Sequence, residues 1–74
     1  MNYFWIKAEG KNIFIKEITE EGTVIKTDFE DEACNFDEDE VDEYIKLLNK
    51  EIPNYKWVRE KIVYLVDETF YEVD

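Results

Sequence analysis

The sequence contains no histidine, and this absence excludes the commonest catalytic designs. Without an imidazole the chain has no Ser-His-Asp or Cys-His arrangement and no histidine ligand for a metal ion. Glycine is scarce as well: Gly10 and Gly22 are the only two, and a turn accounts for each, so no glycine-rich loop can hold a phosphate group. The sequence therefore favours a protein that is not an enzyme and that uses no cofactor.

Cysteine is limited to Cys34, which cannot form a disulfide within the chain. Because a secreted protein of 74 residues usually needs several disulfides, we expect a cytoplasmic location. The N-terminus lacks the basic start and apolar stretch of a signal peptide, and no run of about 18 apolar residues could span a bilayer. Cys34 stands among carboxylates, which disfavour a thiolate, so it is predicted to pack as a small side chain and not to act as a nucleophile.

Positive charge is scarce and unevenly placed. The chain has 20 acidic and 9 basic residues, for a net charge of −11. Ten of the carboxylates fall within residues 28–43, which contain no Lys or Arg, and we call these ten the acidic block. Its members are Asp28, Glu30, Asp31, Glu32, Asp37, Glu38, Asp39, Glu40, Asp42 and Glu43. This charge repels nucleic acid and anionic membranes at long range, so direct binding to either is disfavoured.

The N-terminal half has the composition of strands. Residues 3–8, 13–18 and 23–29 are rich in β-branched and aromatic side chains and are separated by glycine-containing turns, which predicts a three-stranded antiparallel meander. Alternation along the first strand places its apolar face on Phe4, Ile6 and Ala8. In the third strand the same alternation groups Ile25 and Phe29 with two threonines.

The C-terminal half begins with a helix. Apolar residues recur at three- and four-residue steps after Asp37, which predicts an amphipathic helix over about 38–50 with Asp37 as N-cap, Glu40 completing a capping box and Pro53 ending it. The apolar stripe comprises Val41, Tyr44, Ile45, Leu48 and Ile52. We expect a β-hairpin beyond it, with strands at 61–66 and 69–73; a second helix over 54–66 is the alternative. The prediction is a small single α+β domain across residues 1–74.

No metal site is predicted in the acidic block, although its carboxylates alternate as oxygen ligands do. A calcium-binding EF-hand loop needs a glycine at its sixth position, and neither register of the block supplies one. Part of the block has a structural explanation, because carboxylates from Asp37 to Glu40 would complement the dipole of the predicted helix and keep the domain soluble. The remaining carboxylates repel one another without a lysine between them, which favours a role in binding.

The physical reading of this charge is complementarity to a basic partner protein. A dense patch of one sign steers an oppositely charged surface towards it, and neighbouring aromatic rings supply apolar contact. The strongly basic surfaces of proteins are commonly those that hold phosphates, so we expect a nucleic-acid-binding protein or nuclease as partner and DNA mimicry as the mechanism. The predicted binding residues are the ten members of the acidic block together with Phe36 and Tyr44.

In size, charge and lack of catalytic groups the chain resembles small acidic phage-encoded inhibitors of host defence nucleases, including anti-CRISPR and anti-restriction proteins. The resemblance is one of general character and rests on no motif. It implies an inhibitor acting in the host cell cytoplasm. Two alternatives use the same physics: an immunity protein or antitoxin that neutralises a nuclease toxin, and a small accessory subunit of a nucleic-acid machine. The apolar side chains Tyr3, Trp5 and Phe14 are expected to pack as core beneath the C-terminal segment; the alternative is a second, apolar interface, and a homodimer remains open.

Overall fold

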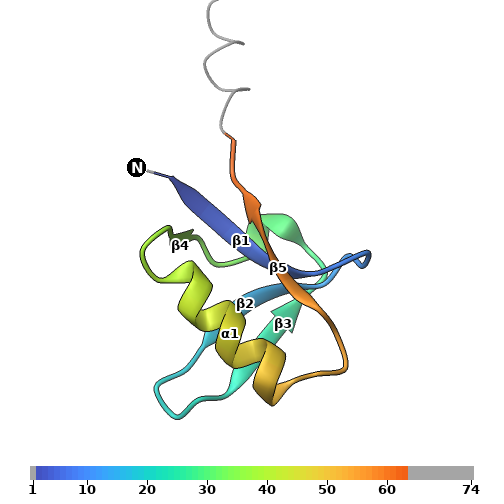
Figure 1. Ribbon diagram of the computed structural model, residues 1–74. Helices are drawn as coiled ribbons and strands as arrows, with labels where there is room; N and C mark the ends of the chain where they lie inside the picture. The colour runs from blue at the N-terminus through green and yellow to red at the C-terminus, as the bar shows by residue number, and fades with distance from the viewer. Residues whose placement is uncertain (1, 64–74) are drawn as a thin grey trace, which may run out of the picture.

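The structure is a computed structural model that describes residues 2–63. Its elements follow one another as an antiparallel α+β domain, as predicted. Strands β1 and β2 are followed by β3, a short 3-10 helix η1, strand β4, helix α1 and strand β5 (Figure 1). Their bounds are β1 Tyr3–Ala8, β2 Phe14–Ile18, β3 Val24–Thr27, η1 Glu30–Glu32, β4 Phe36–Asp37, α1 Val41–Glu51 and β5 Trp57–Lys61.

Strand β1 is the centre of the sheet, and every pairing is antiparallel. Phe4 pairs with both Phe36 of β4 and Lys61 of β5, so these two strands lie on opposite edges of β1. Lys7 likewise pairs with Phe14 of β2 and with a residue of β5. Strands β2 and β4 therefore share one edge, β5 has the other, and β3 joins through β2, which confirms the predicted meander.

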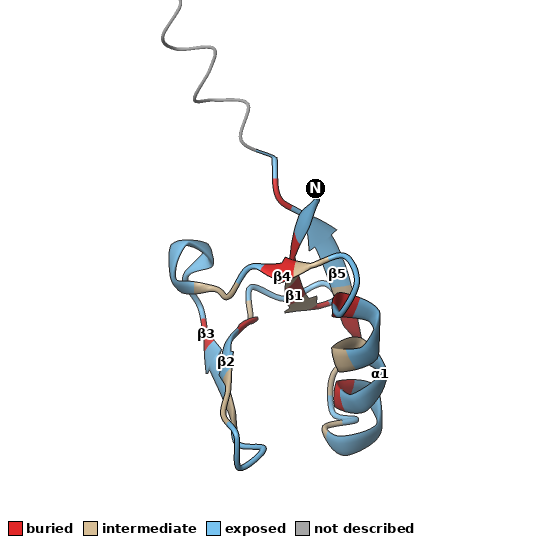
Figure 2. Cartoon of the chain, turned by 90° about the vertical axis from the view of Figure 1, so that its left-hand side faces the viewer, coloured by how far each residue is buried: buried red, intermediate tan, exposed pale blue. Residues whose placement is uncertain are grey.

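The β2–β3 hairpin diverges from β1, and α1 descends on the other side of the molecule. Figure 2 shows the hairpin and the helix as two arms joined above by β1, β4 and β5. The core lies where the arms meet. Its fully buried members include Ile6, Ile15, Val41, Leu48 and Trp57. The predicted alternation in β1 is confirmed, because Phe4, Ile6 and Ala8 are all buried.

The ladder of the β2–β3 hairpin contains one irregularity. The pairing register of β2 with β3 shifts between Ile15 and Glu17, which is a β-bulge at Lys16. Strand β3 ends at Thr27, two residues before the end predicted for it. Ile25 within it is 37% exposed, and Phe29 beyond it is 62% exposed.

Helix α1 begins at Val41 and not at residue 38. Asp37 is not its N-cap, because β4 pairs Asp37 with Tyr3 of β1. The Oδ1 atom of Asp37 instead accepts a hydrogen bond from the backbone N–H of Asp39 at 3.0 Å, in the turn before the helix. Glu40 is the N-cap residue and makes no side-chain cap. The predicted end is confirmed, since the helix stops at Glu51, ahead of Pro53.

Residues 57–61 form a strand, which excludes the alternative helix there. The strand begins at Trp57, earlier than the predicted residue 61, because hydrogen bonds join Trp57 to α1 and to Ile52, the residue that follows α1. The backbone N–H of Trp57 donates to Oδ1 of Asn49 at 2.8 Å, and Nδ2 of Asn49 donates to the backbone carbonyl oxygen of Trp57 at 3.2 Å. The indole Nε1–H donates to the carbonyl oxygen of Ile52 at 3.1 Å. The rest of the predicted hairpin, residues 64–74, lies outside the described residues.

Candidate functional site

The acidic block occupies a strip across one end of the molecule. In Figure 2 the segment that carries it runs from the end of β3, on the hairpin arm, through η1 and β4 to the start of α1. Three carboxylates lie on η1, Asp37 lies in β4, and Asp42 and Glu43 lie in the first turn of α1. The structure thus spreads the block over η1, β4, α1 and the segments that connect them, and does not gather it at one helix terminus.

The η1 part of the strip is fixed by β2 and β3. The hydroxyl of Thr27 donates to Oε1 of Glu32 at 3.0 Å and accepts the N–H of Phe29 at 3.1 Å. Just after η1, the N–H of Cys34 donates to the carbonyl oxygen of Ile15 at 3.0 Å. These bonds hold the short 3-10 helix against the hairpin, and its three carboxylates remain exposed.

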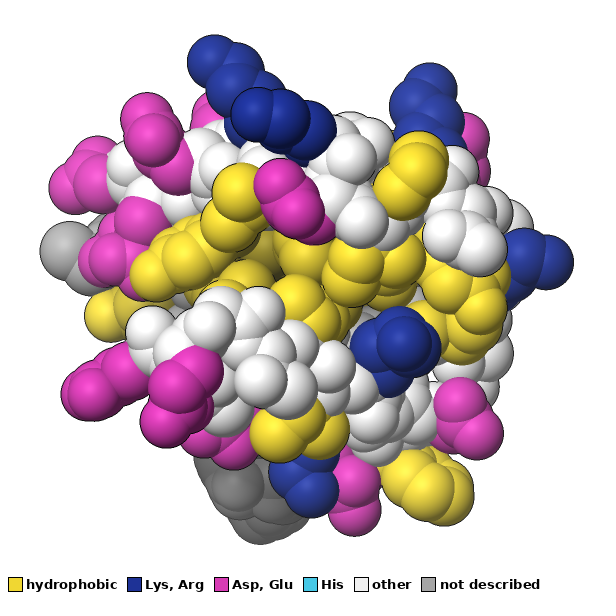
Figure 3. All heavy atoms as spheres, turned by 90° about the horizontal axis from the view of Figure 1, so that it is seen from below, with side chains coloured by type: hydrophobic (Ala, Val, Ile, Leu, Met, Phe, Trp, Pro, Cys, Tyr) yellow, Lys and Arg dark blue, Asp and Glu magenta, His cyan; other side chains and the backbone are white. Residues whose placement is uncertain are grey.

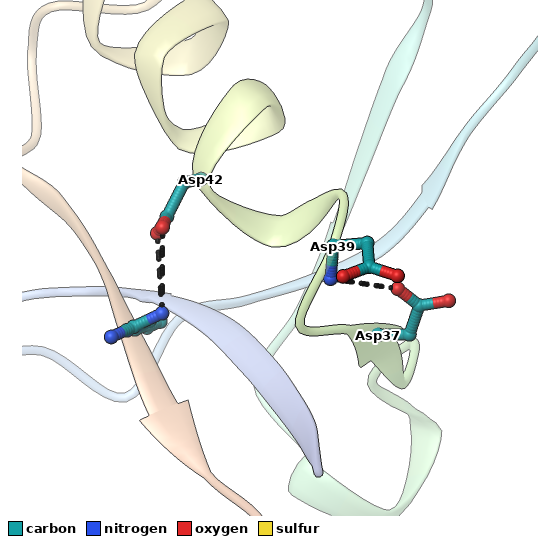
Figure 4. Close-up of polar contacts among 4 residues, drawn as sticks. Asp37, Asp39 and Asp42 are labelled. Carbon is teal, nitrogen blue, oxygen red and sulfur yellow. Dashed lines mark hydrogen bonds and ion pairs between the residues drawn. The ribbon is translucent and has the colours of Figure 1, made fainter. Parts of the chain in front are cut away.

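Two members of the block form ion pairs within the described residues. Glu32 lies 3.8 Å from Lys16, and Asp42 lies 3.4 Å from the guanidinium of Arg59 (Figure 4). Arg59 also lies over the ring of Phe4, 4.8 Å from its centroid, so the Asp42 pair connects α1 to β5 and β1. Both pairs are substantially exposed, and each contributes at most about 1 kcal/mol.

The other eight carboxylates have no ion pair among residues 2–63. Asp37 is half-buried and has the turn hydrogen bond to Asp39, which Figure 4 shows beside the start of the helix. The remaining seven are exposed to solvent. These are Asp28, Glu30, Asp31, Glu38, Asp39, Glu40 and Glu43.

The two predicted aromatic contacts differ in exposure. Phe36 is 5% exposed and belongs to the core, with its ring centroid 5.3 Å from that of Tyr44, so its ring is not available at the surface. Tyr44 is half-buried. The aromatic ring that does reach the surface beside the block is Phe29, at 62% exposure. Its position in the sequence, between Asp28 and Glu30, is the signal that points to it.

The thiol of Cys34 lies next to the strip. Burial of this side chain raises its pKa above the ordinary value, and the carboxylates of Glu40 and Glu17 raise it further. Both effects disfavour the negatively charged thiolate, which is the nucleophilic form of cysteine. Cys34 therefore contributes packing against the core and no activated sulfur.

Residues 2–63 hold no cluster of three or more carboxylate or thiol groups that could coordinate a metal ion. In the same part of the chain, no helix has the length and apolar character needed to cross a membrane. No protein-family model, curated protein or solved structure matches this chain.

Proposed function

We propose that this protein is a non-catalytic binding protein whose acidic block engages a basic surface of a partner protein. The observation that supports this is the set of seven exposed carboxylates that have neither an ion pair within the described residues nor a lysine or arginine in their own segment. Such a cluster keeps a domain soluble but destabilises its compact state through self-repulsion, and an external cation that meets the cluster relieves that repulsion.

Helix-dipole stabilisation accounts for less of the block than the sequence suggests. The favourable effect of a carboxylate is confined to the first turn of a helix. Because α1 begins at Val41, only Asp42 and Glu43 lie in that turn, whereas Glu38 and Asp39 precede the helix. The carboxylates on η1 belong to a 3-10 helix of three residues, which has little dipole of its own. Most of the block thus lacks a stabilising role.

The partner surface that fits this strip is one built to hold phosphates. Such surfaces carry clustered Lys and Arg, and a protein that covers them blocks nucleic-acid binding. Exposed Phe29 adds an apolar contact within the charged strip, which is what a stable interface needs in addition to charge. The proposal therefore includes competition with nucleic acid, as an inhibitor that mimics DNA would show. An immunity protein or a polymerase subunit would use the same strip with a different partner.

Charge reversal on matched sites tests the proposal. The variant Glu38→Lys/Asp39→Lys changes the block, and Glu17→Lys/Glu20→Lys makes the same change in net charge outside it. Partners captured from lysate of the source cell on the unmodified protein should be lost with the first variant and kept with the second. Affinity for the captured partner should fall steeply between low and physiological salt. Equal capture by both variants would contradict the proposal.

The captured partner also decides between the alternatives. Displacement by duplex DNA supports mimicry of a nucleic acid, because the two ligands would then share one surface. A captured defence nuclease identifies an inhibitor, a co-encoded toxin identifies an immunity protein, and a polymerase identifies an accessory subunit. A partner held without competition from DNA would refute mimicry but leave the acidic interface intact.

A further inference from the structure

A second surface lies between the two arms of the fold. Ile18 and Val24 of the hairpin face Leu47, Leu48 and Ile52 across an open groove of about 550 Å³, which we call the arm groove. Figure 3 looks into the molecule from below and shows apolar side chains gathered in this hollow, with acidic side chains beside it. The exposed carboxylates that line the groove are Glu21 and Glu51.

Leu47 is the residue that packing does not explain. The core stripe of α1 uses Leu48, which is 1% exposed, whereas the adjacent Leu47 is 46% exposed. Leu47 also lines a neighbouring hollow of about 560 Å³ on the helix surface, whose other lining residues are Tyr44, two glutamates (Glu40 and Glu43) and two lysines (Lys46 and Lys50). The apolar surface therefore continues along α1 from the arm groove towards the acidic block. An exposed leucine at the junction of two hollows is typical of a contact residue.

The walls of the arm groove present apolar side chains from two kinds of element. Ile18 and Val24 are paired with each other in the hairpin ladder, and the opposite wall is a helix whose backbone is bonded internally. Side chains of both walls therefore make the contacts in the groove. A peptide that suits such walls is an amphipathic helix that lays its apolar face in the groove, with contacts at three- and four-residue steps.

The charge of the groove lining indicates the chemistry of the helix that binds there. Glu21 and Glu51 are the charged residues that line the groove, and they favour a helix with Lys or Arg flanking its apolar face. In the neighbouring hollow two glutamates and two lysines balance, so the selection rests on the groove itself. A second copy of this chain carries −11 and would be repelled. The chain's own segment 64–74 has four acidic residues and no basic one.

We propose that the arm groove binds a cationic amphipathic helix of a partner protein. The proposal goes beyond the acidic block, because the apolar contacts and the carboxylates Glu21 and Glu51 belong to other parts of the chain. Either surface can fail its test while the other stands. In a partner that uses both, the helix would anchor in the groove while its basic surface covers the strip.

A synthetic peptide of about 18 residues, five turns of helix, is the probe. It contains only Leu and Lys, with Leu at helical spacing, and its control has the same composition in an order that gives no apolar face. Fluorescence anisotropy at about 150 mM salt compares the two at constant charge. We expect the patterned peptide to bind at least about tenfold more tightly, because only its leucines can be buried together.

Matched variants locate the binding site. Leu47→Ser should weaken binding of the patterned peptide about five- to tenfold, the effect of removing one half-exposed leucine from the contact. Ile25→Ser removes a similarly exposed side chain outside the groove lining and should leave affinity unchanged. Glu21→Gln/Glu51→Gln should lower affinity and reduce its dependence on salt, whereas Glu17→Gln/Glu20→Gln should do neither. The double glutamine variants keep the test valid if Leu47→Ser alters the fold.

Three outcomes would overturn the proposal. Equal binding of the two peptides would show that charge alone attracts them. Loss of binding with Glu38→Lys/Asp39→Lys but not with the groove variants would place the peptide on the acidic block and leave the proposed function standing. Sedimentation showing a dimer that Leu47→Ser dissociates would assign the groove to a second copy of the chain.

Discussion

At the scale of single residues, Cys34 shows how the acidic surroundings act on a neighbouring group. Its pKa is raised first by burial and then by Glu40 and Glu17, so the neutral thiol is favoured in the folded protein. The folded state therefore holds the proton to higher pH than the unfolded chain does. As pH rises above the ordinary thiol pKa, the unfolded chain loses this proton first, and the contribution of Cys34 to stability declines.

Alkylation by iodoacetamide across a pH series measures this shift. The rate should rise with the thiolate fraction, with a midpoint at higher pH in the folded protein than in the same chain unfolded in urea. Glu40→Gln should move the folded midpoint part of the way back, because burial is the larger cause and remains. A folded midpoint at or below that of the unfolded chain would refute this account of the site.

At the scale of elements, the sequence determines the type of each segment better than its ends. The apolar periods predict β1, β2 and α1 correctly, because each pattern reports one buried face. The predicted start of α1 is wrong because Asp37 is suited both to N-capping and to a strand. In the structure it pairs with Tyr3 of β1, near the N-terminus, and does not cap the helix. The bulge at Lys16 is a feature of the β2–β3 pairing that the alternation of either strand does not reveal. Local pattern contains no information on such long-range pairing.

The same limit applies to the candidate sites. The acidic block is visible in the sequence because its members are contiguous. The arm groove is not, since Ile18 and Val24 meet Leu47 only after the hairpin and the helix have been placed around β1. Phe36 shows the converse. Its position among carboxylates in the sequence predicts an interface residue, but the side chain of Phe36 in β4 is buried in the core.

Asn49 determines where β5 begins, through its two hydrogen bonds to the backbone of Trp57. Asn49→Ala should lower the free energy of unfolding by about 1–3 kcal/mol, because Trp57 is buried and its backbone groups lose their partner. Urea denaturation measures the change. Asn54→Ala is the matched control: Asn54 is exposed in the turn before β5, and a change within about 0.5 kcal/mol is expected there. Equal effects of the two substitutions would contradict an anchoring role for Asn49.

At the scale of the whole molecule, apolar packing and surface charge have different roles. Buried apolar side chains around β1 hold the two arms together. Ion pairs contribute little, because in all four among the described residues at least one partner is exposed. Most carboxylates of the acidic block consequently do not help to hold the fold together. Leu47 and most carboxylates of the two proposed surfaces are exposed, so substitutions of these residues should alter binding without unfolding the domain.

Stability measurements separate a functional block from a merely structural one. Glu38→Gln/Asp39→Asn removes two exposed carboxylates that have no ion pair in the described chain, so repulsion falls and the free energy of unfolding should rise by a few tenths of a kcal/mol. Asp42→Asn breaks the pair with Arg59 and should lower it by about 0.5–1 kcal/mol. Added salt should stabilise the unmodified protein more than the double variant, because salt screens the repulsion that the variant lacks. If removing Glu38 and Asp39 instead destabilised the fold as Asp42→Asn does, their carboxylates would be structural, and the case for an external cationic partner would lose its main support.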